Sequence, residues 1–148
     1  MGLFDNLFGD KAADRRPLTE PEAFAGVLLA AAAWDGHAGK QEVADLRAVL
    51  GRMKLFADLT DGRWRALADT LVRLLKRDGV LGLADRCAAA VPPELRDCAF
   101  ANACDLILAD GAVEDAERAF LEHLQRALDL DADTALNIVE VMITKNKG

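Results

Sequence analysis

The chain has 148 residues, of which 52% are hydrophobic, and its formal net charge at pH 7 is -7. This length suits one domain around a single core. The negative charge argues against nucleic-acid binding, because affinity for phosphate backbones comes from Lys and Arg. The three Cys lack C-x-x-C spacing and indicate neither a disulfide framework nor a zinc knuckle. Free thiols indicate a reducing compartment. Because the sequence also has no secretory signal and no apolar run long enough for a membrane span, we expect a cytoplasmic protein.

Residues 1–16 are predicted to form an N-terminal arm. Four large apolar residues recur there at helical spacing, before Gly9 and a charged linker: Leu3, Phe4, Leu7 and Phe8. The stripe predicts docking against a partner protein or against the inner face of a membrane, or else a helix folded back onto the domain. Asp5 and Asp10 weaken the attraction of the arm to anionic lipid.

Residues 17–148 are predicted to form an all-α domain, a single bundle of about seven helices. Abundant Ala and Leu, no Tyr and only four Pro favour packed helices over strands. Thr19 and Glu22 have the spacing of a capping box, and Asp131 is expected to cap the last helix. Apolar periodicity between such signals predicts helices at about 24–34, 40–53, 61–78, 80–91, 94–108, 114–128 and 131–143.

The two halves of this domain share one pattern. A shift of 75 positions aligns WDGHAGKQEVADL with ADGAVEDAERAFL, and each half reads as core helix, Asp-Gly loop, amphipathic helix and third helix. We therefore expect repeat halves at about 17–78 and 93–145, related by a pseudo-twofold axis.

The Asp-Gly loops contain the only chemistry that the sequence suggests. Asp35 and Asp110 follow the C-terminal ends of helices, where a carboxylate is disfavoured by the helix dipole. Glu42 and Glu117 lie in the first turn of the next helix, and Glu114 joins the second loop. A bound Ca²⁺ or Mg²⁺ would account for these carboxylates, since both ions prefer oxygen ligands. Helix termination by Asp-Gly and capping by Glu would produce the same pattern without a ligand.

No arrangement of residues indicates a reaction. The sequence has no nucleophile–base pair, H-E-x-x-H motif or phosphate-binding glycine loop, and His37 and His123 are expected to be solvated. The cysteines are expected to be small buried hydrophobes. Asp105 lies in an otherwise apolar helix and is expected to face outward or to accept a hydrogen bond from a neighbouring helix. The sequence therefore favours a binding module over an enzyme.

Each half of the domain has a core helix, an Asp-Gly loop and a Glu-bearing helix. This arrangement resembles the TerB-like tellurite resistance family over roughly residues 17–143, and the better match is the stretch LILADGAVEDAERAFLEHLQRALDL in the second half. The resemblance implies an all-helical stress-response module that binds a divalent metal and associates with stress-response or membrane-linked complexes. Gly39 departs from the pattern, because the second copy has an acid at that place. A metal-free adaptor that docks proteins or a membrane is the alternative. The residues that match the acidic set of the family are Asp35, Glu42, Asp110, Glu114 and Glu117.

Overall fold

Capping signals and apolar stretches set the ends of the helices in the computed structural model, which describes residues 16–35, 39–109 and 113–148. These residues contain six α-helices, two short 3-10 helices and no strand, so the all-α prediction is confirmed for them. The elements are α2 (Glu20–Ala32), α3 (Lys40–Leu50), η1 (Lys54–Phe56), α4 (Asp61–Ala90), η2 (Pro93–Leu95), α5 (Arg96–Ile107), α6 (Asp115–Ala127) and α7 (Ala132–Lys145).

Three helices begin at side-chain caps that the sequence indicates. Thr19 starts α2 with a complete capping box, in which its hydroxyl accepts a hydrogen bond from the Glu22 N–H at 3.2 Å. The Thr60 hydroxyl caps α4 in the same way, and the Asp131 carboxylate caps α7. Each cap satisfies a backbone N–H that has no partner inside its helix. The two 3-10 helices are not foreseen, and η1 contributes the buried Phe56 to the core.

A break at Gly79 divides α4. Its φ of 77° and ψ of 175° are not helical, and a positive φ is accessible to glycine at little cost. No atom lies within 4 Å of the position of a Cβ there, so the backbone angle and not crowding favours glycine. The two helices predicted at 61–78 and 80–91 thus correspond to the two parts of α4 before and after this break. The prediction of about seven helices becomes six in the described part of the chain.

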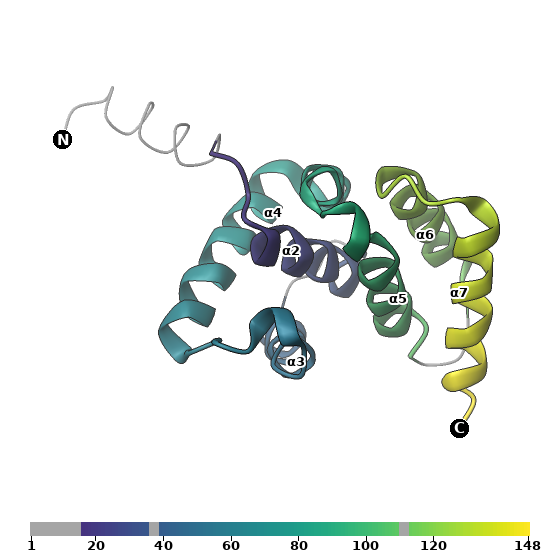
Figure 1. Ribbon diagram of the computed structural model, residues 1–148, viewed down its shortest axis with the longest axis horizontal. Helices are drawn as coiled ribbons and strands as arrows, with labels where there is room; N and C mark the ends of the chain where they lie inside the picture. The colour runs from purple at the N-terminus through teal and green to yellow at the C-terminus, as the bar shows by residue number, and fades with distance from the viewer. Residues whose placement is uncertain (1–15, 36–38, 110–112) are drawn as a thin grey trace.

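The apolar helix α2 lies at the centre of the molecule. Figure 1 shows it with α3 and the first part of α4 on one side and α5 with the last part of α4 on the other, while α6 and α7 form the far end. All of its residues from Glu22 to Ala31 are buried, which explains why it lacks a polar face. Small side chains allow close packing. At Gly26 a Cβ would collide with the sulfur of Cys87 on α4, so glycine is required by this approach.

The helices pack in two groups that meet at α2 and α5. α2 packs against α3 and α4, α5 packs against α6 and α7, and α2 and α5 pack against each other. α4 also contacts α6, through the part that follows Gly79. The buried residues form one hydrophobic core, consistent with a single domain. The pseudo-twofold axis stays a prediction. Among the described residues no helix has the length and apolar character needed to cross a membrane.

Candidate functional site

The second acidic loop leads directly into α6. Glu114 is the N-cap of this helix and Glu117 is its third residue. The Glu114 carboxylate accepts a hydrogen bond from the backbone N–H of Glu117, and the Glu114 N–H donates to Glu117 Oε1 at 3.3 Å. Glu117 is only 4% exposed. The structure therefore brings these two predicted ligands together, and it shows that both also cap the helix.

The first acidic loop is built on the same plan with one difference. Gly39 is the N-cap of α3, and it supplies no side chain to the helix. The half-buried Glu42, third in α3, folds back so that Oε2 lies 2.5 Å from the position of a Cβ on Gly39. Asp35 is exposed after the end of α2. The first loop therefore lacks the second carboxylate that Glu114 provides in the other copy.

The two predicted cation sites combine residues of the helices with residues of the Asp-Gly loops. Asp110, together with Gly36, His37 and Gly111, lies outside the described residues. Within the part of the chain that is described, no three His, Cys, Asp or Glu residues are grouped so that they could hold a metal ion. A carboxylate offers about four lone-pair positions, so one capping bond leaves the exposed Glu114 with acceptor capacity. The set Asp110, Glu114 and Glu117 stays a prediction.

Two acidic side chains outside the Asp-Gly loops, Glu22 and Asp105, are held by hydrogen bonds. Arg16 donates to both oxygens of Glu22, at 2.8 and 2.6 Å, and this pair lowers the pKa of Glu22 to about 2. Partial burial acts to raise the pKa of Asp105, but hydrogen bonds from Lys145 and Asn146 at 2.9 and 3.1 Å outweigh it and the pKa lies below its usual value. Asp105 thus accepts hydrogen bonds from the end of a neighbouring helix, as predicted.

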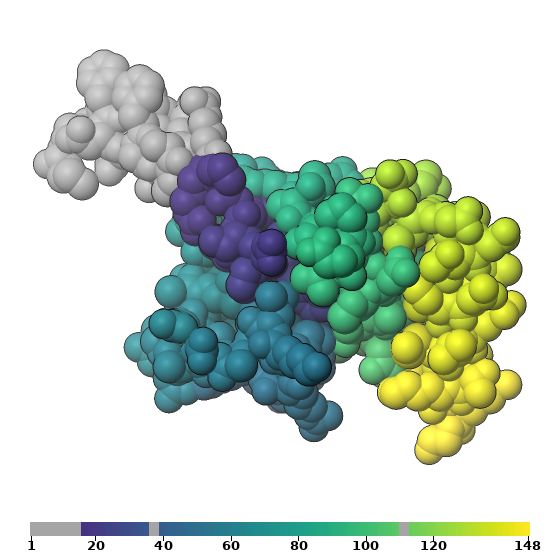
Figure 2. All heavy atoms as spheres, viewed as in Figure 1, coloured from purple at the N-terminus to yellow at the C-terminus, as the bar shows by residue number. Residues whose placement is uncertain are grey.

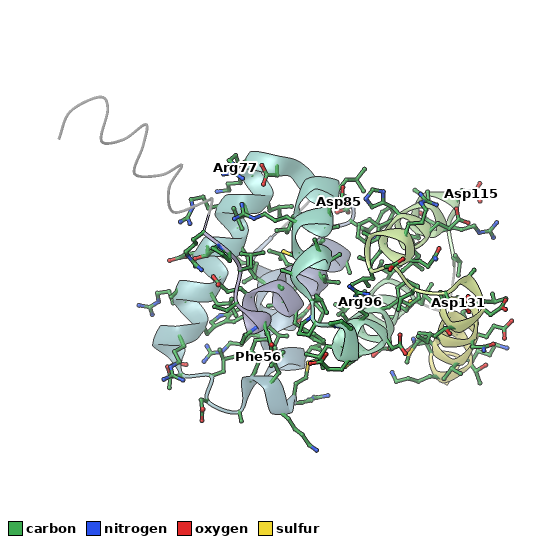
Figure 3. All side chains as sticks on the ribbon, turned by 45° about the horizontal axis from the view of Figure 1, so that its top comes forward. Phe56, Arg77, Asp85, Arg96, Asp115 and Asp131 are labelled. Atoms are coloured by element: carbon green, nitrogen blue, oxygen red, sulfur yellow. The ribbon has the colours of Figure 1, made fainter. Side chains whose placement is uncertain are left out.

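Two expectations about reactive side chains need correction. His123 is half-buried and not freely solvated, because its Nε2 lies 2.7 Å from an oxygen of Asp85. Figure 3 shows Asp85 on the part of α4 that faces α6. Cys98 is exposed, whereas Cys87 and Cys104 are buried and burial raises the pKa of each thiol to about 12. The pairing of a surface His with an Asp 38 positions earlier has no local sequence signal.

A groove between α6 and α7 was not predicted. Its volume is about 520 Å³, and three rim residues on α6 are charged: Arg118, Glu122 and Arg126. Leu136 lies in the groove and is 55% exposed. The apolar surface of the groove comes from Phe100, Val113, Leu121, Ala132, Ala135, Leu136, Val139 and Ile143.

The C-terminal helix is unusually exposed for its composition. Ala135 is its only residue classed as buried, and Val141 on another face is 60% exposed. Figure 2 shows α7 along one edge of the molecule. The apolar residues of α7 at i, i+3 and i+7 from Leu136 are the signal that could have indicated the groove.

The predicted docking residues Leu3, Phe4, Leu7 and Phe8 lie outside the described residues. The described chain begins at Arg16, whose carbonyl accepts a hydrogen bond from Arg86 on α4 at 3.2 Å. The ion pair with Glu22 and this bond attach the base of the arm to α2 and α4.

Comparison of the chain with protein-family models, with curated proteins and with solved structures finds no match in any of the three.

Proposed function

We propose that this chain is a TerB-like helical module of the tellurite-resistance and stress-response type, which binds a divalent cation at its second acidic loop and catalyses no reaction. The observation that carries the proposal is the buried carboxylate of Glu117 beside Glu114 at the start of α6. Asp110 precedes them in the same loop. Three carboxylates and loop carbonyls form an oxygen-rich ligand set of the kind that Ca²⁺ and Mg²⁺ accept.

The two loops are not equivalent in this proposal. Glu114 provides a carboxylate where the first loop has Gly39, so the second loop has three acidic residues and the first has Asp35 and Glu42. Affinity for a hard cation rises with the number of charged oxygen ligands. We therefore expect the second loop to bind first and more tightly.

Titration calorimetry and thermal unfolding of the full chain with CaCl₂ or MgCl₂ test the cation site. Cation at 100 times the dissociation constant stabilises the folded state by about 2.7 kcal/mol, which raises Tm by about 5–10 °C in a domain of this size. Asp110→Asn should remove most of this shift, and Asp35→Asn should remove less. Asp69→Asn, an exposed carboxylate on α4, is the matched control. Absence of heat and of any Tm shift at millimolar cation would refute cation binding.

A second candidate is an adaptor without a metal, which docks through its N-terminal arm to proteins of a stress-response assembly or to a membrane. The observation that supports it is the exposed apolar surface of α7, at Leu136 and Val141, and the groove beside it, because uncovered apolar surface is typical of contact sites. The replacements Phe4→Asp and Phe8→Asp would remove the apolar stripe of the arm. Co-sedimentation with vesicles of phosphatidylethanolamine and phosphatidylglycerol, with and without these replacements, tests membrane docking.

A further inference from the structure

We propose that the groove between α6 and α7 binds the N-terminal arm of a second copy of this chain. The inference rests on the docking function proposed for the arm, and it assigns the arm a specific acceptor. The α6–α7 groove is the acceptor, and residues 1–8 are the occupant.

The groove has the dimensions and the chemistry of an acceptor for a short amphipathic helix. Its lining residues on α7 run from Ala132 to Ile143, which corresponds to about 16 Å of helix. A helix of eight residues is about 12 Å long. Leu136, Val139 and Ile143 lie on the α7 side, and Leu121 lies opposite on α6. Amphipathic helices commonly bind in apolar grooves of this type.

The arm matches the groove in pattern and in charge. Its apolar residues at positions 3, 4, 7 and 8 fall on one face of a helix, and the one charged side chain among residues 1–8 is the carboxylate of Asp5. The rim of the groove has two exposed guanidinium groups, from Arg118 and Arg126, against one carboxylate, from Glu122. Neither of these arginines forms an ion pair with another described residue. An apolar helix whose one charged side chain is a carboxylate is therefore a complementary ligand.

The attachment of Arg16 favours a second copy over the same chain. Arg16 is held by Glu22 and Arg86, so the arm starts from a fixed point beside α2 and α4. Figure 1 shows this start on one side of the molecule and α6 and α7 on the other, with α5 and part of α4 between. Residues 9–15 span about 25 Å at most when fully extended. A neighbouring molecule can place its groove beside the arm, so that residues 9–15 need not pass around α4 and α5.

Fluorescence polarisation with a labelled peptide of residues 1–12 tests the acceptor. The receptor is the full chain with Phe4→Asp and Phe8→Asp, whose own arm cannot compete. We expect saturable binding that weakens at least tenfold when the receptor also has Leu136→Asp. Val141→Asp is the matched control, because Val141 is 60% exposed on the same helix but does not line the groove. A second test replaces two exposed residues of the receptor, Arg118→Glu and Arg126→Glu. These replacements should weaken peptide binding and should reduce the dependence of the binding on salt concentration.

Light scattering after size-exclusion chromatography completes the experiment. The wild-type chain should increase in mass with concentration, and the chain with Phe4→Asp and Phe8→Asp should stay monomeric. No peptide binding, equal binding by the Leu136→Asp receptor, or a wild-type monomer at all concentrations would overturn the inference. A wild-type monomer that sediments with vesicles through its arm would also overturn it, while the docking function of the arm would stand.

Discussion

Replacement of Glu22 by Gln should lower stability in a manner that depends on pH. Glu22 receives two hydrogen bonds from Arg16 and one from the Thr19 N–H at 3.0 Å, and it is 8% exposed. Gln can still accept from Thr19, so the replacement removes mainly the charge that binds Arg16. A paired charge of this kind contributes about 1.5–3 kcal/mol, and the 47% exposure of the Arg16 side chain reduces it to about 2 kcal/mol.

The sign of the pH dependence follows from the lowered pKa. The folded-state pKa of Glu22 is about 2 and the ordinary value is 4.5, so the charged form is favoured by folding. This contribution is fully present above about pH 4.5 and is lost as pH falls towards 2, with roughly half of it gone by pH 3. The Gln variant lacks the titrating group. The stability difference between wild type and variant should therefore shrink over the same range.

Urea unfolding followed by circular dichroism at pH 7, 4 and 3 measures this difference. Glu20→Gln, an exposed carboxylate in the same turn of α2, is the control and should change stability by less than about 0.5 kcal/mol. Arg16→Met should cost about as much as Glu22→Gln, and the double variant should cost little more than either. A Glu22→Gln effect that is absent at pH 7, or that stays constant down to pH 3, would refute the reasoning.

Three further predictions concern packing, helix anchoring and thiol reactivity. Gly26→Ala should destabilise the fold by about 1–3 kcal/mol in urea unfolding, because the added methyl group meets Cys87, and Cys87→Ala in the same chain should restore part of the loss. Asp105→Asn should speed hydrogen exchange in the last turns of α7, which Asp105 holds through Lys145, and unchanged exchange would contradict that anchoring. In native protein at pH 8, Ellman's reagent should modify Cys98 rapidly and leave the two buried thiols intact, since burial raises the pKa of each to about 12. All three cysteines should react in guanidinium chloride.

Local signals in the sequence predict most of the fold because they act over a few residues. The caps at Thr19, Thr60 and Asp131 accept hydrogen bonds from backbone groups three positions away, and apolar periodicity identifies the faces that pack. The break at Gly79 follows a local Asp-Gly signal, whereas the direction that α4 takes after the break depends on its packing against α2 and α6, which is not local.

The candidate sites were predictable to different degrees. The pairing of Glu114 with Glu117 follows from their three-residue spacing, because that spacing is the capping-box spacing. The ion pair of Asp85 and His123 and the α6–α7 groove depend on the placement of helices far apart in the sequence. Helix periodicity identifies an apolar face, but it does not show whether another helix covers that face.

The close contact at Gly26 has a mechanical consequence for the break in α4. Gly26 on α2 lies against Leu71 before the break and against Cys87 after it. The helix α2 therefore packs against both parts of the bent α4. A glycine with a positive φ in the middle of a helix would otherwise be a natural hinge. Here, bending at Gly79 would pull one part of α4 away from α2 and open the centre of the core. The two parts of α4 should therefore unfold together with α2, as one cooperative unit.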